Sequence, residues 1–217
     1  MTARVTGSIR VPAVSRCPQC GADRISPVVC PRCGVAEGVG DDAFALLGLQ
    51  PSWGVDPQEL EQRYIAILSL LDPNSAAAAS VTAARRLLLD PLTRGRHLVE
   101  AYGGQHQEQG VETQEFLTEV MELSRETEEA IAQRDPARLS GLVTEAEEKL
   151  ASMIMAAGQS FVRLERTVAD EVAAAARSLA GASYWSAVVD ELREKVTRLE
   201  GQRAAGRRPE GDEARDI

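Results

Sequence analysis

TQEFLTEVMELSRETEEAI, residues 113–131, is an uninterrupted amphipathic pattern. Its apolar side chains recur every three or four residues, which places them on one face of a helix, and charged side chains fill the opposite face. The apolar face consists of Phe116, Leu117, Val120, Leu123, Thr127 and Ile131. Because a helix with one apolar face needs partner helices to cover it, this stretch predicts a helical bundle.

Two more amphipathic segments follow on the C-terminal side. Asp135-Pro136 combines an N-cap residue with a proline at the first helical position, so it predicts the start of a long second helix. The apolar positions of this helix continue to Val172, and we expect a third helix from about Ser183 to Leu199. We predict an antiparallel three-helix bundle over residues 112–201 and a disordered tail at 202–217.

Shorter helices separated by strong stop signals are predicted on the N-terminal side of the bundle. Asp56-Pro57 opens one of them, and Asp72-Pro73-Asn74 ends it. The others are expected near residues 41–48, 82–89 and 91–98, and Gly103-Gly104 follows the last. Residues 41–104 therefore predict a small helical domain.

All four cysteines fall between residues 17 and 33, as CPQC, nine further residues, and CPRC. Two residues between paired cysteines let the chain turn so that both sulfurs face one ion, and a glycine follows each pair. Two such pairs form the closed four-sulfur shell of a structural zinc site. We predict a zinc knuckle over residues 15–36, with Cys17, Cys20, Cys30 and Cys33 as ligands.

Three other interpretations of the cysteines remain open. They could form two disulfides, or one CxxC pair could serve redox chemistry, although nothing in the sequence indicates an oxidising compartment. Iron in a rubredoxin-like site is the third, because four thiolates do not by themselves select the metal. A closed shell offers no open coordination position, so catalysis by this metal is not expected.

The net charge of −9 is unevenly distributed, since residues 105–201 contain 19 acidic and 10 basic side chains. An acidic bundle repels phosphate backbones, so nucleic acid is not an expected partner. No apolar run has the length of a membrane span. We find neither a phosphate-binding loop nor a catalytic constellation, so we do not expect an enzyme.

The expected location is the bacterial cytoplasm. The first 16 residues contain Arg4, Arg10 and Arg16 and no acid, which leaves a mitochondrial origin open. Residues 1–14 are interpreted as a disordered N-terminus.

Residues 41–200 resemble the HscB family, the J-protein co-chaperones of iron–sulfur cluster assembly. The segments with this resemblance are DAFALLGL (42–49), VDPQELEQRY (55–64), DPLTRGRHLVEAYGG (90–104) and QEFLTEVMELSRETEEA (114–130). The knuckle is similar to the zinc module of the family's eukaryotic branch. The resemblance implies a mainly α fold with a zinc knuckle, a J-domain-like helical hairpin and a C-terminal three-helix bundle. It also implies a non-enzymatic adaptor between an IscU-type scaffold and a DnaK/HscA-type chaperone.

The resemblance places Asp72-Pro73-Asn74 where the family has His-Pro-Asp, the tripeptide that docks on the chaperone and triggers ATP hydrolysis. Arg63 is the only cation of the preceding helix, against Glu59 and Glu61. We therefore expect weak docking on an acidic chaperone groove. Alternatively, the tripeptide is an ordinary helix stop.

The scaffold-binding residues implied by the resemblance are Leu117, Thr118, Met121, Glu122, Arg125 and Glu129, with Tyr184 or Trp185 from the last helix. Thr118 replaces an apolar residue and Arg125 replaces an acid. An alternative is that Leu117 and Met121 belong to the bundle core.

Two other functions are compatible with the sequence. One is a zinc-ribbon adaptor for nucleic acid or a transcription complex. It is disfavoured because no aromatic residue precedes Phe44, and bases need aromatic side chains for stacking. The other is a J-like scaffold that does not stimulate ATP hydrolysis.

Overall fold

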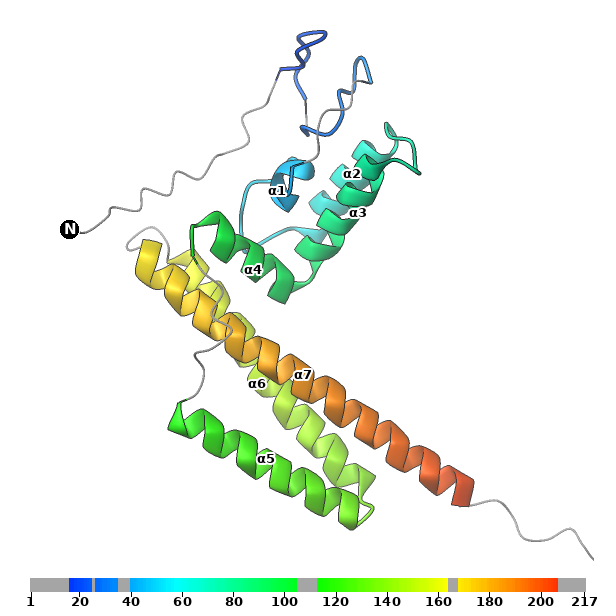
Figure 1. Cartoon of the computed structure of the whole chain (residues 1–217), viewed down its shortest axis with the longest axis vertical. Coiled ribbons are helices and arrows are strands. Elements are labelled where there is room, and N and C mark those ends of the chain that lie inside the picture. Colours follow the sequence, from blue (N-terminus) through cyan, green and yellow to red (C-terminus); the bar gives the residue numbers. More distant parts are fainter. Residues whose placement is uncertain (1–15, 25, 35–39, 105–112, 164–167, 207–217) are drawn as a thin grey trace, which may run out of the picture. The chain divides into compact units, whose positions relative to one another are not determined.

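The computed structural model describes residues 16–24, 26–34, 40–104, 113–163 and 168–206. Within these ranges the regular elements are helices, apart from an isolated antiparallel bridge between Arg16 and Asp23. The mainly α fold predicted from the sequence is therefore confirmed (Figure 1). The helices are α1 (Ala43–Leu46), α2 (Pro57–Leu68), α3 (Ala76–Leu89), α4 (Pro91–Ala101), α5 (Gln114–Ala132), α6 (Pro136–Val162) and α7 (Val168–Gly206).

The chain divides into two compact units. The first, here called the J-like unit, comprises Met1–Gln107 and Ile154–Leu179. The second, the bundle unit, comprises Glu108–Met153 and Ala180–Ile217. Helices α6 and α7 therefore contribute to both units. The sequence analysis predicted a helical domain that ends at residue 104 and a bundle that begins at 112, whereas the first unit also includes Ile154–Leu179.

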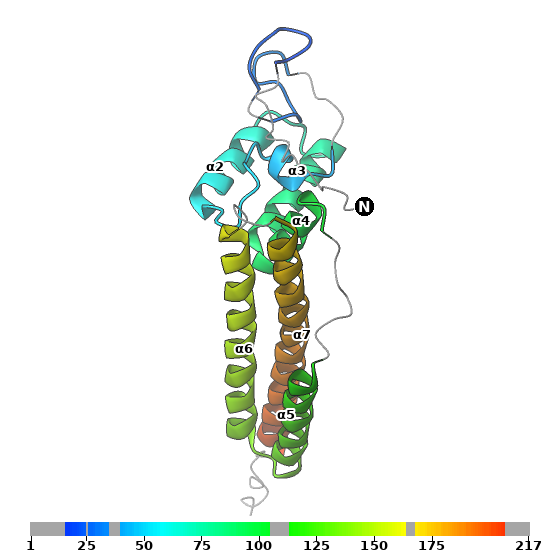
Figure 2. The same cartoon turned by 90° about the vertical axis from the view of Figure 1, so that its left-hand side faces the viewer.

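The J-like unit is built around the hairpin of α2 and α3, with α1 packed against α3 (Figures 1 and 2). The core includes Phe44 and Leu47 from the α1 region, Leu60 and Ile67 from α2, Val81 and Leu88 from α3, and Leu98 and Val99 from α4. The last turns of α6 add Phe161 to this core, and the first turns of α7 add Leu179. The J-like unit therefore depends on residues that are distant in the sequence.

The helix starts follow the capping signals of the sequence. The carboxylate of Asp56 accepts a hydrogen bond from the backbone N–H of Gln58, and Pro57 begins α2. The carboxylate of Asp90 likewise accepts from Leu92 and Thr93 at the start of α4. The prediction for α3 was too short: Ser75 caps this helix, so α3 begins at Ala76 rather than near residue 82. Alanine residues in this first turn favour helix.

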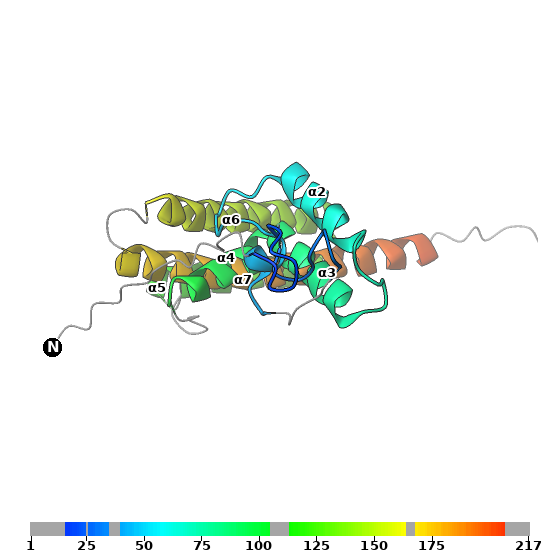
Figure 3. The ribbon, with the colours of Figure 1, turned by 90° about the horizontal axis from the view of Figure 1, so that it is seen from above.

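The bundle unit contains α5 with the parts of α6 and α7 assigned to it, and α6 lies side by side with α7 (Figures 2 and 3). Its core contains Leu139 and Leu142 from α6 and Trp185, Val189 and Leu192 from α7, among others. The three-helix bundle is confirmed as the architecture of this region.

Three predicted helix boundaries in the bundle were wrong. The second helix ends at Val162, and the third begins at Val168 rather than near Ser183. The apolar periodicity continues from one helix into the next, so it does not mark the turn. At its other end α7 continues to Gly206, beyond the expected boundary at 201. The rest of the predicted tail and the predicted disordered N-terminus lie outside the described residues.

Candidate metal centre and partner-binding surfaces

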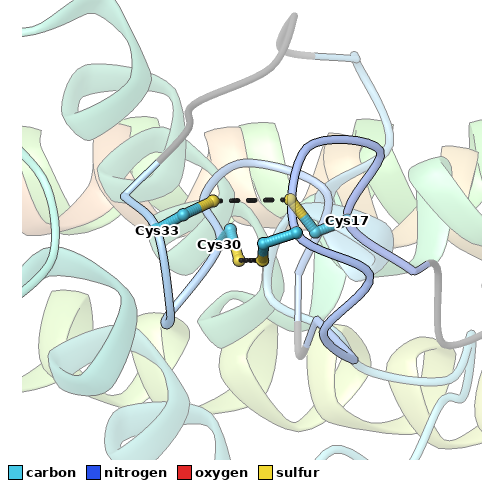
Figure 4. Close-up of side chains that lie close together, drawn as sticks. Cys17, Cys30 and Cys33 are labelled. Atoms are coloured by element: carbon cyan, nitrogen blue, oxygen red, sulfur yellow. Dashed lines mark hydrogen bonds between the residues drawn. The ribbon is translucent and has the colours of Figure 1, made fainter.

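The four cysteine sulfurs form one cluster. The Sγ atoms of Cys17, Cys20, Cys30 and Cys33 all lie within 4.8 Å of one another. Two sulfur–sulfur separations join the two knuckles: 3.5 Å between Cys17 and Cys33, and 3.6 Å between Cys20 and Cys30 (Figure 4). A tetrahedral zinc ion with bonds of about 2.3 Å requires sulfur–sulfur distances of about 3.8 Å. The arrangement therefore fits a tetrathiolate metal site, and none of these four cysteines forms a disulfide.

Backbone hydrogen bonds shape both knuckles, and in the second one they favour the thiolate form of Cys30. The N–H of Gly21 donates to the carbonyl of Cys17, and the N–H of Gly34 donates to that of Cys30. Both glycines have positive φ angles, of 69° and 71°, which a residue with a side chain rarely adopts. Backbone N–H groups of Cys33 and Arg32, together with the thiols of Cys33 and Cys20, lower the pKa of Cys30 from 9.0 to about 6 against the opposing effect of burial. This lowered pKa favours the thiolate form of Cys30, which is the form that binds a metal.

The segment between the two knuckles is attached to the J-like core. Val28 and Val29 are fully buried in the same cluster as Phe44 and Leu47. The hydroxyl of Ser26 donates to the carbonyl of Leu46 at 2.6 Å and accepts from the N–H of Val28. The metal centre is therefore part of the J-like unit rather than a separate module.

The tripeptide Asp72-Pro73-Asn74 lies exposed in the loop between α2 and α3. The carboxylate of Asp72 accepts from the backbone N–H of Asn74 at 2.9 Å, and its carbonyl accepts from the hydroxyl of Ser75 at 2.7 Å. Asp72 thus shapes the turn that leads into α3. The preceding helix ends earlier than expected, at Leu68, with Ser69 as its C-cap.

Arg63 does not present a free cation on α2. Its guanidinium donates to the carbonyl of Gly48 at 2.7 Å and forms an ion pair with Glu59 at 2.9 Å. Glu61 is paired with Arg85 at 2.6 Å. The exposed surface of α2 therefore has no unpaired charge among these residues. The same helix exposes Ile65, which the sequence analysis did not single out. Its position outside the apolar stripe of α2 is the signal that could have indicated this exposure.

The predicted scaffold-binding residues of α5 all lie at the surface. We call Leu117, Thr118, Met121, Glu122, Arg125 and Glu129 the α5 face; all six are exposed. Leu117 is 42% exposed and Met121 is 72% exposed, so the alternative that they belong to the core is wrong. Arg125 forms an ion pair with Glu129 at 2.6 Å, whereas Glu122 has no ion pair among the residues that the structure describes.

Tyr184 is an exposed aromatic residue of α7 that contacts α5. Its ring contacts Phe116 of α5 edge-on, with centroids 5.0 Å apart, and its side chain is at the surface. Trp185 is 3% exposed and belongs to the bundle core, so it cannot offer its ring to a partner at this face. Of the two aromatic candidates, Tyr184 is therefore the one available at the surface.

Comparison with known proteins agrees with this architecture. Residues 112–193 match the family model described as the HSCB C-terminal oligomerisation domain. The chain is 32% identical to the co-chaperone protein HscB homolog of Bordetella pertussis over 123 residues, which cover 50% of this chain and 71% of the relative. The chain belongs to the HscB co-chaperone family.

Solved HscB structures have the same fold. Human co-chaperone HscB superimposes with a TM-score of 0.66 at 22% identity, covering 83% of this chain and 98% of the human one. HscB from Vibrio cholerae gives a TM-score of 0.58 at 24% identity, covering 74% and 98%. In this HscB-family chain, no helix among the described residues is both long and apolar enough to cross a membrane.

Proposed function

We propose that this HscB-family chain is a non-enzymatic adaptor of iron–sulfur cluster assembly in the bacterial cytoplasm. It joins an IscU-type scaffold, bound at the α5 face and Tyr184, to a DnaK/HscA-type chaperone. Family membership supports the adaptor role, and the bacterial origin of the matched relative supports the location. The observation that most favours scaffold binding is the exposure of Leu117 and Met121 on α5, whose neighbouring Phe116 contacts the exposed Tyr184.

The apolar residues of the α5 face supply the expected attraction. Fully burying a leucine or methionine side chain contributes about 1.5–3 kcal/mol. Only part of this becomes affinity, because association costs translational and side-chain freedom. An exposed methionine is also adaptable in shape, which suits a binding surface. A partner with a complementary apolar patch would therefore bind across Leu117, Met121 and Tyr184.

The charged residues of the α5 face set the partner's charge. Glu122 is available for a cation, whereas Glu129 is partly neutralised by Arg125. We therefore expect the scaffold to present one basic side chain opposite Glu122, beside its apolar patch.

The chaperone arm of the proposed adaptor is weak. A J protein needs a trigger tripeptide and a positively charged helix that steers it to the chaperone. Here Asp72 is engaged in its own turn, and Arg63 is engaged with Gly48 and Glu59. The zinc-binding knuckle is proposed to have a structural role, because its four thiolates leave no open position; the same donors also suit iron.

Charge reversal tests the scaffold contact. The double variant Glu122→Arg with Glu129→Arg should bind an IscU-type scaffold roughly tenfold or more weakly, because it replaces acids with cations opposite a basic surface. Titration calorimetry measures the affinity, and circular dichroism checks that the helical content is unchanged. Glu148→Arg, an exposed glutamate of α6, is the matched control and should retain the parent affinity. Equal binding by the double variant would show that the acids of α5 do not contact the scaffold.

The matched family model is described as an oligomerisation domain, so self-association is the competing use of the α5 face. Sedimentation of the chain alone shows whether it self-associates. If the α5 face binds the scaffold and not a second copy, the scaffold should bind with the same affinity across a range of adaptor concentrations, because self-association does not compete for this face.

A further inference from the structure

The four cysteines of the metal centre differ in their access to solvent. Cys17 and Cys30 are buried, at 2% and 0% exposure, and Cys20 is partly buried. Cys33, the last of the four in the chain, is exposed. The oxidation of a cysteine by a small molecule depends on the thiolate form and on exposure. An oxidant that arrives from solvent therefore reaches the sulfur of Cys33 before the sulfurs of the two buried cysteines.

A second sulfur lies within reach of the sulfur of Cys33. The Sγ atom of Cys33 is 3.5 Å from the Sγ atom of Cys17, which belongs to the other knuckle (Figure 4). The Sγ atoms of Cys20 and Cys30 form an equivalent contact between the knuckles at 3.6 Å. Redox-sensing sites combine an exposed thiolate with a neighbouring cysteine that converts the first oxidation product into a disulfide. The metal centre has both of these features.

We propose that the four-cysteine centre is an oxidation site for hydrogen peroxide, at which two disulfides between the knuckles take the place of the metal. The thiolate of Cys33 attacks peroxide, so that an S–O bond forms, the O–O bond breaks and hydroxide leaves. The thiolate of Cys17 then attacks the sulfenic acid on Cys33, so that an S–S bond forms, the S–O bond breaks and a second hydroxide leaves.

The electrons of each step balance. The two thiolates together lose two electrons, one molecule of peroxide gains them, and the two hydroxide ions take up protons from water. A second molecule of peroxide oxidises Cys20 and Cys30 in the same way. Because the thiolate is the form that binds a metal, the fully oxidised centre no longer holds an ion.

Pairing between the knuckles determines what happens to the J-like core. Cys17 and Cys33 stand at the two ends of the segment that contains Val28 and Val29, both of which are buried in this core. A disulfide between Cys17 and Cys33 keeps this segment closed, so both valines stay in the core after the metal has left. Disulfides within each CxxC pair would leave the two knuckles unconnected. The oxidised chain should therefore keep its J-like unit folded, unlike the reduced chain after chelation.

The test uses the metal-loaded, full-length chain, with hydrogen peroxide as the probe. A chromogenic chelator should detect the release of one metal ion per chain, and dithiothreitol with added zinc should restore the loaded state. Dimedone, which reacts with sulfenic acids, should label Cys33 in preference to Cys17 and Cys30 when peroxide is limiting.

Trypsin cleavage shows which cysteines are paired. Cleavage after Arg16, Arg24 and Arg32 separates the cysteines into peptides 17–24, with Cys17 and Cys20, 25–32, with Cys30, and 33–63, with Cys33. The proposed pairing joins all three peptides in one non-reduced product, and fragmentation between Cys17 and Cys20 in the mass spectrometer assigns the two bonds. Disulfides within the knuckles would instead give peptide 17–24 alone and join 25–32 to 33–63.

Hydrogen exchange in α1 measures the effect on the core. Exchange should stay slow in the oxidised chain and become roughly tenfold faster or more in the reduced, chelated chain. The proposal is overturned if excess peroxide releases no metal, or if release produces sulfinic or sulfonic acids without disulfides. It is also overturned if the disulfides lie within the knuckles, or if α1 exchanges as fast after oxidation as after chelation.

Discussion

Removing the metal from the four-cysteine site should destabilise the whole J-like unit. Val28 and Val29 lie between the two knuckles and are completely buried in the J-like core. Without a metal ion the four cysteines no longer hold the two knuckles together, and both side chains can leave the core. At about 1.5–3 kcal/mol for each buried valine, the free energy of unfolding of this unit should fall by about 3–6 kcal/mol.

The measurement starts from protein purified under reducing conditions. Elemental analysis should find one zinc ion per chain, because cells supply zinc to closed four-thiolate sites. After chelation, hydrogen exchange should accelerate in α1 and in the α2–α3 hairpin, whereas α5 of the bundle unit should be unaffected. The metal-loaded variant Val28→Ala should show a smaller loss of the same kind.

Two outcomes would contradict this coupling. Protein that contains no metal, or that contains disulfides directly after lysis, would show that the cysteines serve another purpose. Unchanged exchange in α1 after chelation would show that the knuckle folds and unfolds independently of the J-like core.

Strong stimulation of chaperone ATP hydrolysis should require changes at both the tripeptide and α2. The unmodified protein should stimulate its own HscA- or DnaK-type chaperone weakly in single-turnover assays. Asp72→His with Asn74→Asp restores the family tripeptide but not the steering charge. Losing one charge-assisted hydrogen bond typically costs about 1.5–3 kcal/mol, which corresponds to roughly a tenfold to a hundredfold change in rate. The restored tripeptide should raise the rate of ATP hydrolysis by this factor only when docking is also restored.

The structure determines where the steering charge should be added. Glu59 and Glu61 pair with Arg63 and Arg85, so replacing either one would break an existing ion pair. Gln58 and Gln62 are exposed and one turn apart, and Gln58→Lys with Gln62→Lys adds charge without this loss. The gain should fade as salt is raised.

Adding one lysine in the bundle unit, at exposed Gln133, to the variant with the restored tripeptide should give no gain in the ATPase assay. Strong stimulation by the unmodified protein would show that Asp72-Pro73-Asn74 is itself a competent trigger.

Local signals in the sequence predicted the elements that depend on local chemistry. Asp56 and Asp90 cap helices where expected, and the CPxCG spacing brings four sulfurs together. Each of these features is determined by residues within a few positions of one another. The helices of the bundle were predicted from apolar periodicity, which also depends on residues three or four positions apart.

Features that depend on long-range packing were not predictable. The apolar pattern is continuous between α6 and α7, so nothing local revealed where the chain turns. Tyr184 and Trp185 are adjacent and both aromatic, and only the rotation of α7 decides which one is buried. The burial of Val28 and Val29 against α1 likewise requires the tertiary fold, because the intervening sequence gives no sign of it.

The central claim, that the α5 face binds the scaffold, is tested most directly by calorimetric titration with an IscU-type scaffold. The parent protein should bind with a negative heat-capacity change, because apolar surface is buried. Met121→Asp should weaken this binding by tenfold or more, whereas Met155→Asp should not, although Met155 is also exposed, at 62% against 72% for Met121. No binding by the parent protein, or equal binding by both variants, would contradict the claim.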